Sequence, residues 1–144
     1  MLKLDPTHNA ARYELGIVYL NRHRAGQAKE QFQRVLSSDQ NDGYAHLGLG
    51  MALAAEQNDA AAVHEYEQAA QLQPDLDSVY YRMGLSQAKL KNYDAAIRSF
   101  LSQLDKVGDD ADTEQALAEA YRAKGMTKEA DEAAQKTEKL KSKK

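Results

Sequence analysis

Apolar residues recur along this chain at the spacing of amphipathic helices, with polar side chains between them. In the stretch that contains Leu47, Met51 and Ala54, for example, apolar positions are separated by three or four residues. This spacing places them on one face of a helix. It predicts four first helices at about 10–22, 43–56, 77–90 and 111–124. Four second helices are predicted at about 25–38, 59–72, 93–106 and 127–141, joined by the short turns that helix hairpins require.

The helical pattern repeats every 34 residues, in four copies from Asn9 to Lys144 without insertion or deletion. A small residue recurs in each first helix, at Gly16, Gly50, Gly84 and Ala118. An alanine recurs twelve positions later, at Ala28, Ala62, Ala96 and Ala130. A large ring recurs in three of the second helices, at Phe32, Tyr66 and Phe100, and Ala134 takes its place in the fourth. A fixed period of this length is typical of a repeat architecture.

The recurring glycines indicate close contacts between helices. Glycine inside a helix costs roughly 1 kcal/mol relative to alanine, so something must offset this cost at three equivalent positions. We expect two helices to approach closely there, with the large rings of the second helices packed across the gap. The alternative, that the glycines mark loops, is disfavoured because each lies inside a pattern of helical spacing.

These landmarks resemble the tetratricopeptide repeat (TPR), in which each repeat is a pair of antiparallel helices. The resemblance covers nearly the whole chain. It implies an all-α fold, a right-handed α-solenoid of antiparallel helix pairs known as the TPR superhelix. Its repeats would be residues 9–42, 43–76, 77–110 and 111–144. Three departures weaken individual repeats: Gln87 and Gln103 at apolar positions, and a last helix without an aromatic ring.

The two ends of the chain have their own interpretations. Residues 1–8 are interpreted as the tail of a truncated preceding repeat, since Pro6 matches Pro74 in the closing turn of the second repeat. An ordinary disordered start is the alternative. The last helix is largely charged, and five lysines lie among the last nine residues. We interpret it as a solubilising capping helix with a basic tail, because solenoids need a polar outer face at their ends.

Polar residues that can cap helices also recur every 34 residues, at Thr7, Asn41, Asp75 and Asp109. Their side-chain oxygens can accept hydrogen bonds from the free amides of a first helical turn. Asn58 and Asn92 are predicted caps of two second helices.

Composition and residue chemistry exclude several classes of function. Charged residues make up 28% of the chain, and no apolar run reaches the roughly eighteen residues of a membrane span. The net charge of −3 gives no bias toward nucleic acid, and the chain has no cysteine. The four histidines are not spaced to share a helix face, and His46 and His64 are predicted to be packing or surface residues. We therefore predict no catalytic residues, no metal site and no cofactor.

In the TPR family the first helices line a concave groove, and this resemblance identifies the candidate site. The matching positions here are largely apolar: Tyr13, Ile17, Leu20, Tyr44, Leu47, Met51, Tyr81 and Leu85. In the fourth repeat they are polar, at Gln115, Glu119 and Arg122. Apolar surface of this kind typically marks an interaction site; the alternative is that part of it is buried between helices. One TPR subclass binds acidic peptide C-termini through a lysine and an asparagine, where this chain has Tyr13 and Ile17.

The predicted function is a non-catalytic protein–protein interaction scaffold that binds an apolar or amphipathic peptide or helix. Binding of nucleic acid is not predicted. One alternative is a structural element that self-assembles. Its open N-terminal end would then meet a second copy, through a partly exposed face that includes Tyr13 and some of Ala11, Leu15 and Val18. Another alternative is a regulatory repeat array of a larger enzyme. The sequence does not give the compartment, and a soluble cytoplasmic protein is the default expectation.

Overall fold

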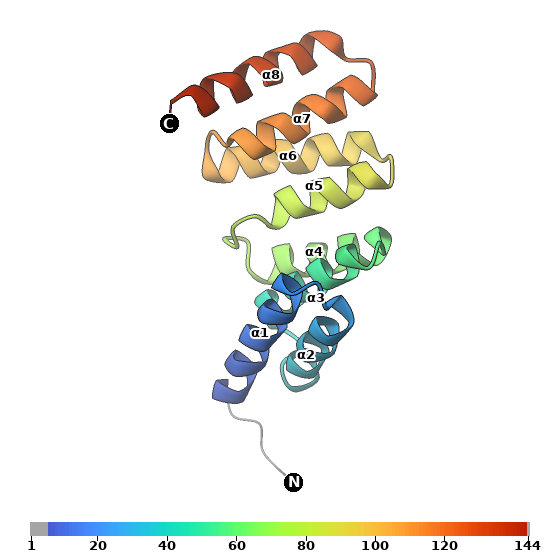
Figure 1. Cartoon of the computed structure of the whole chain (residues 1–144), viewed down its shortest axis with the longest axis vertical. Coiled ribbons are helices and arrows are strands. Elements are labelled where there is room, and N and C mark those ends of the chain that lie inside the picture. The colour runs from blue at the N-terminus through green and yellow to red at the C-terminus, as the bar shows by residue number, and fades with distance from the viewer. Residues whose placement is uncertain (1–5, 144) are drawn as a thin grey trace. The chain divides into compact units, whose positions relative to one another are not determined.

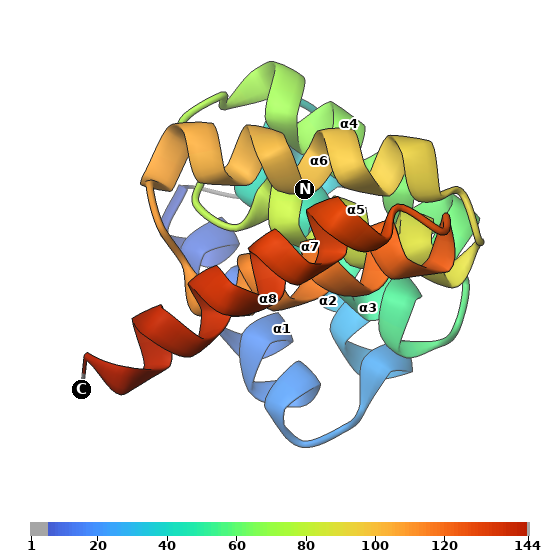
Figure 2. The same cartoon turned by 90° about the horizontal axis from the view of Figure 1, so that it is seen from above.

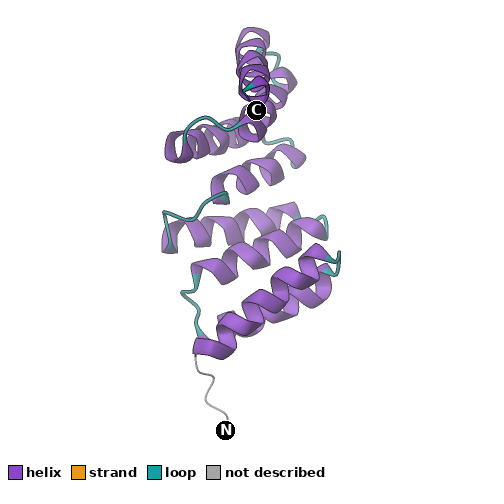
Figure 3. Cartoon of the chain, turned by 60° about the vertical axis from the view of Figure 1, so that its left-hand side comes forward, coloured by secondary structure: helices purple, strands orange, loops and turns teal. Residues whose placement is uncertain are grey.

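The computed structural model describes residues 6–143, and all regular secondary structure in this range is helical. Eight helices follow one another through short connections (Figures 1 and 3). They are α1 (Pro6–Asn21), α2 (Ala25–Ser38), α3 (Gly43–Ala55), α4 (Asp59–Leu72), α5 (Val79–Lys89), α6 (Tyr93–Val107), α7 (Ala111–Ala123) and α8 (Thr127–Ser142). The predicted all-α fold class is confirmed.

The chain divides into two compact units. Unit 1 comprises residues 1–76 and unit 2 residues 77–144. In unit 1 each helix packs on the next, and the two first helices, α1 and α3, also touch each other. Unit 2 repeats this scheme, with contacts between consecutive helices from α5 to α8 and between α5 and α7 (Figure 2). Each unit is therefore built from two helix hairpins stacked on each other.

The helix boundaries agree with the prediction except at the first helix. Helices α2 to α8 begin and end within two residues of the predicted positions. Within the described residues the first helix already includes Pro6, well before its predicted start at about residue 10. Thr7, a predicted cap, therefore lies inside α1. The predicted stub falls partly outside the described residues, which begin at residue 6.

The side-chain caps of two first helices lie one residue later than predicted. Asp42, not Asn41, precedes α3, and its carboxylate accepts a hydrogen bond from the amide three residues on, at 3.1 Å. Asp110, not Asp109, does the same for α7 at 3.3 Å. Each aspartate satisfies one of the amides that a helix start leaves without a partner.

The remaining predicted caps have mixed outcomes. Asn58 caps α4, accepting from the amide of Ala61 at 3.4 Å. Asn92 occupies the capping position of α6 but makes no side-chain capping bond. Helix α5 is preceded by Ser78, with a φ angle of 69°, instead of Asp75.

The recurring glycines have the packing role that the sequence predicts. A Cβ atom added to Gly50 would lie 2.6 Å from a ring carbon of Tyr66, and carbon atoms do not approach so closely. The same added atom would lie 2.7 Å from Phe32 at Gly16 and 2.5 Å from Phe100 at Gly84. In the fourth hairpin both sizes change together, since Ala118 replaces the glycine and Ala134 replaces the ring. The small and large residues are thus matched within each hairpin.

Phe32 has a second glycine contact that the sequence analysis missed. A Cβ atom on Gly48 of α3 would lie 2.4 Å from its ring. The ring is fully buried, with 0% exposure. Phe32 therefore fills the space between a glycine of its own hairpin, Gly16, and a glycine of the next one.

Two of the predicted weaknesses are compensated by hydrogen bonds. Gln87 is buried, and its side-chain oxygen accepts a 2.6 Å bond from the hydroxyl of Ser99. The side-chain oxygen of Gln103, also buried, accepts from the backbone amide of Tyr81 at 3.2 Å. Buried polar groups are normally paired in this way, so each glutamine at an apolar position has a hydrogen-bond partner for its side-chain oxygen.

Candidate functional site

The predicted site residues lie in both units, so each unit presents its own part of the site. In unit 1, α1 carries Tyr13, Ile17 and Leu20, which are all half-buried. Helix α3 carries Tyr44, Leu47 and Met51, of which Tyr44 is the most accessible, with 48% of its surface exposed. In unit 2, α5 carries Tyr81 and Leu85, both half-buried.

Leu47 does not belong to an accessible surface. Its exposed fraction is 7%, because α3 is the central helix of unit 1 and packs against α1, α2 and α4. Here the alternative interpretation, burial of part of the strip, is correct. The expectation that Leu47 faces a partner is therefore corrected to a core position.

The rings of Tyr13 and Tyr44 form the aromatic part of the site in unit 1. Their centroids are 6.0 Å apart in an edge-to-face arrangement, and Tyr13 also packs on Phe32 at 5.7 Å. Edge-to-face contact places the positive edge of one ring on the negative face of the other. Since Phe32 is held between two glycines, Tyr13 rests on a rigid base.

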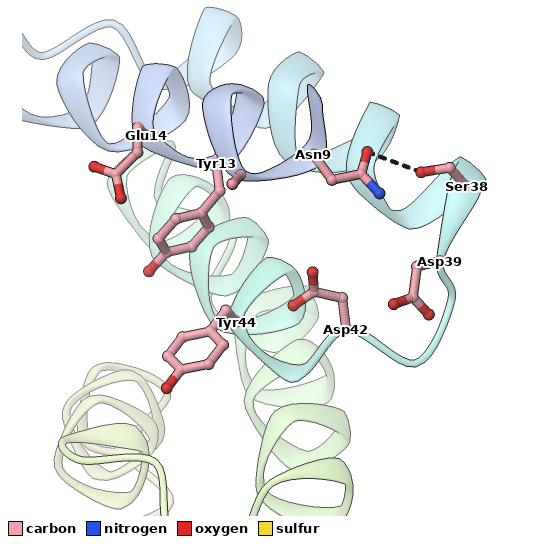
Figure 4. Close-up of a pocket in the computed structure, with 8 residues that line it drawn as sticks. Asn9, Tyr13, Glu14, Ser38, Asp39, Asp42 and Tyr44 are labelled. Atoms are coloured by element: carbon pink, nitrogen blue, oxygen red, sulfur yellow. Dashed lines mark hydrogen bonds between the residues drawn. The ribbon is translucent and has the colours of Figure 1, made fainter. Parts of the chain in front are cut away.

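A pocket of about 620 Å³ opens beside these rings. We call it the tyrosine pocket; it is lined by Asn9, Ala10, Tyr13, Glu14, Ser38, Asp39, Asp42 and Tyr44. Figure 4 shows the two tyrosines with their hydroxyl groups directed to the same side, and Asp42 with its carboxylate turned toward α1. At one end Ser38 donates a 2.9 Å hydrogen bond to Asn9, which joins the end of α2 to α1.

The carboxylates of the tyrosine pocket were missed by the sequence analysis. Asp39 and Asp42 come from the turn between α2 and α3, whereas the site was sought only on the faces of the first helices. Asp39 accepts a 3.0 Å bond from the amide of Asn41, and Asp42 caps α3. The predicted cap in this turn was the neutral Asn41, and only the stacking of the two hairpins brings the two aspartates into the lining of the pocket.

In unit 2, Tyr81 is part of the packing of the unit. It lies against a buried cluster that includes Phe100 and Leu117, with 6.2 Å between the Tyr81 and Phe100 ring centroids. Burial, followed by the nearby carboxylates of Asp112 and Asp110, raises the pKa of the Tyr81 hydroxyl. Tyr81 is therefore a neutral, half-buried ring.

Leu85 lines a smaller hollow of about 220 Å³, together with Ala88, Tyr93, Phe100, Ala116, Glu119, Ala120 and Ala123. The three polar positions predicted on α7, Gln115, Glu119 and Arg122, are all exposed. The surface of the first helices in unit 2 thus changes from apolar on α5 to polar on α7.

The histidines with predicted roles behave as packing and surface residues. His46 joins three elements, with Nδ1 2.8 Å from a carboxylate oxygen of Glu65 and Nε2 2.9 Å from the backbone oxygen of Gln40. His64 is exposed. Among residues 6–143, no group of three or more histidine, aspartate or glutamate side chains converges to hold a metal ion.

No helix in the described part of the chain combines the length and the apolar character needed to cross a membrane.

Stacked hairpins with small residues facing large rings define a helical-repeat protein. Residues 78–105, which include α5 and most of α6, match the family model described as Tetratricopeptide repeat. This match identifies one tetratricopeptide repeat in the chain, at residues 78–105.

Solved structures with the same fold extend over almost the whole chain. One is a crystal structure of MamA, with a TM-score of 0.88 and 24% identity, which covers 97% of this chain and 84% of that one. A second is MamA 41-end from Desulfovibrio magneticus RS-1, with a TM-score of 0.86 and 22% identity, which covers 95% of this chain and 77% of that one.

A third is the first TPR of Spaghetti (RPAP3) bound to the HSP90 peptide SRMEEVD, with a TM-score of 0.80, 16% identity, and coverage of 85% and 99%. No curated protein sequence matches the chain significantly. At these identities the likeness concerns the fold.

Proposed function

We propose that this protein is a non-catalytic interaction module that binds a segment of a partner protein on its first helices. In unit 1 the contact surface is formed by Tyr13, Ile17, Leu20, Tyr44 and Met51, and in unit 2 by Tyr81 and Leu85. The observation that carries the proposal is the exposure of Tyr44. Tyr44 is 48% exposed, yet its ring packs edge-to-face with Tyr13 beside a large pocket.

An ordered and accessible ring is suited to binding. Tyrosine supplies a large contact area with few rotatable bonds, so little side-chain entropy is lost when a partner covers it. The volume of the tyrosine pocket falls within the range of about 300–1,000 Å³ typical of ligand sites. The fold also supports the proposal, because a structure of the same fold is described as bound to a peptide.

The acidic peptide of that neighbour is not the ligand we propose here. Its sequence, SRMEEVD, carries three carboxylate side chains. The tyrosine pocket itself presents Glu14, Asp39 and Asp42, and like charges at close range repel.

The test is peptide binding by matched surface variants. A twelve-residue peptide selected from a displayed random library would be labelled, and its affinity measured by fluorescence anisotropy. Tyr44→Ala should weaken binding about tenfold, since truncating an aromatic anchor typically costs 1–2 kcal/mol or more. The control is Leu101→Ala on α6, a residue of similar exposure, 45%, on a second helix.

Tyr81→Ala tests the contribution of unit 2 in the same assay. Equal affinities for the wild type, Tyr44→Ala and Tyr81→Ala would show that the partner binds elsewhere, and would refute the proposed surface.

Self-assembly is a second candidate, favoured by exposed apolar side chains on α1. Leu15 is 39% exposed and Val18 is 44% exposed, and adjacent exposed apolar groups favour association. Sedimentation velocity over a wide concentration range tests this candidate: the average mass should rise with concentration and fall back in Leu15→Ser/Val18→Ser. A constant monomer mass would exclude it.

A further inference from the structure

We propose that the tyrosine pocket binds a cationic side chain, an arginine or a lysine, of the partner polypeptide. This inference rests on the proposed function, since it names the chemistry of the partner segment. It is carried by the combination of a large cavity, two ordered tyrosine rings and three carboxylates.

The charge of the pocket is the first argument. Of its eight lining residues, Glu14, Asp39 and Asp42 carry carboxylates and none carries a cation. Arg12 is not a lining residue, but its guanidinium lies 3.5 Å from the side-chain oxygen of Asn9. Three negative charges against one positive charge leave an excess of two, which attracts a cation into the pocket.

Structural roles explain the presence of these side chains but not their charge. Asp39 and Asp42 each use one carboxylate oxygen for a backbone amide, at 3.0 Å and 3.1 Å. Asparagine and serine cap helices about as well as aspartate. The two aspartates among the lining residues therefore add two negative charges that the two amides do not require.

The type of cation follows from the geometry. Among residues 6–143 no three histidine, aspartate or glutamate side chains lie close enough together to hold a metal ion. The carboxylates of the pocket are therefore too far apart to chelate a metal. They are spread along the pocket instead: Figure 4 shows Glu14 next to Tyr13 on α1, Asp39 at the opposite end near Ser38, and Asp42 between them. A cation attached to an apolar stem fits this arrangement, since its stem can lie on the rings while its head meets the carboxylates. Arginine is favoured over lysine, because its planar guanidinium stacks on rings and donates to carboxylates in pairs.

The experiment uses small probes, so it does not depend on finding the natural partner. Amide chemical shifts of the full chain would be followed during titration with N-acetylarginine methylamide, and separately with the norleucine and glutamate analogues. We expect saturable shifts at Asn9, Tyr13, Asp42 and Tyr44 with the arginine probe. Its affinity should exceed that of the norleucine probe by about three- to tenfold, and the glutamate probe should bind most weakly.

Two charge-matched variants give the decisive comparison. Glu14→Gln/Asp39→Asn/Asp42→Asn removes the pocket charges and keeps both capping oxygens. Asp105→Asn/Asp131→Asn/Glu138→Gln removes the same number of charges from exposed positions in unit 2, so each variant changes the formal net charge from −3 to 0. The arginine preference should disappear in the pocket variant and persist in the control variant.

Each outcome decides the inference separately from the proposed function. Equal binding of the arginine and norleucine probes overturns it, as does an arginine preference that survives in the pocket variant or disappears equally in the control variant. Peptide binding that depends on Tyr44 could still be observed in any of these cases, and would leave the proposed function standing. The basic tail, residues 139–144, could supply the cation from a second copy of this chain. In that case the same amides would shift as protein concentration rises, without any probe, and the shifts would vanish when the tail is deleted. This result would overturn binding of a separate partner.

Discussion

Substituting Gly50 by alanine tests the packing principle on which each hairpin depends. In a freely exposed helix this change stabilises by roughly 1 kcal/mol, because alanine is the better helix former. Here the new Cβ would lie 2.6 Å and 2.7 Å from two ring carbons of Tyr66. The ring is only 2% exposed, so it cannot turn outward without disturbing the packing around it.

The expected result is a net loss of stability. Overpacking a filled core costs about 1–3 kcal/mol, and the gain in helix propensity offsets roughly 1 kcal/mol of this. We expect a net destabilisation of up to about 2 kcal/mol, which corresponds to a fall in melting temperature of up to about 8 °C for a chain of this size. Thermal unfolding followed by circular dichroism at 222 nm would measure it.

Gly26 provides the matched control, because it lies in the first turn of α2 with open surroundings. The nearest atom to an added Cβ is a carboxylate oxygen of Glu56, at 3.9 Å. Gly26→Ala should therefore leave the melting temperature unchanged or raise it. The comparison separates overpacking from the general effect of replacing glycine.

A double variant identifies the ring as the cause. In the background Tyr66→Leu the ring carbons near Gly50 are absent, so adding Gly50→Ala should no longer destabilise. The difference between the two backgrounds measures the coupling between the two positions. If Gly50→Ala stabilises the wild type as much as Gly26→Ala does, or costs the same in both backgrounds, the close-contact argument is refuted.

Three further predictions follow from the described residues. Asp110→Ala should lower stability by about 1 kcal/mol through loss of the α7 cap, whereas Asp109→Ala should cost little; equal melting temperatures would contradict the cap assignment. Burial raises the pKa of the Glu114 carboxyl above its ordinary value of 4.5, so the folded state holds the proton more tightly and the stability of the protein falls as pH rises through this range. In denaturant titrations Glu114→Gln should therefore be more stable than the wild type at pH 7 but not at pH 4. An equal gain at both pH values would contradict this prediction. Ser99→Ala should cost about 1–3 kcal/mol by leaving Gln87 unpaired, and the double change Ser99→Ala/Gln87→Leu should recover most of it in the same titrations; no recovery would contradict the buried pair.

Most of the fold could be predicted because its determinants are local and periodic. The spacing of small and large residues sets which faces of two adjacent helices meet, as Gly50 and Tyr66 do. Helix ends were less predictable, since several polar residues compete to cap each start. Asn41 and Asp42 can both accept an amide bond, and only the path of the backbone decides that Asp42 does so.

The candidate site was predictable only in part, for a different reason. A helical period shows which residues share a face, but it does not show how deeply a helix is buried. Leu47 and Tyr44 are three residues apart on α3, yet one is 7% exposed and the other 48%. The helical spacing could not predict the aspartates of the tyrosine pocket, because Asp39 and Asp42 belong to a turn and reach the site only when two hairpins stack.

This separation between scaffold and site explains why the fold does not identify the partner. The glycine and ring positions must match in size to form each hairpin, and they can do so at 16–24% identity to other proteins of this fold. Tyr13, Glu14 and Tyr44 line the pocket, and the hairpin contacts do not require the charge of Glu14. The same scaffold can therefore carry a site for an acidic peptide in one protein and, as we propose, a site for a basic side chain in this one. The side chains around the tyrosine pocket, not the repeat itself, are where the specificity of this protein should be sought.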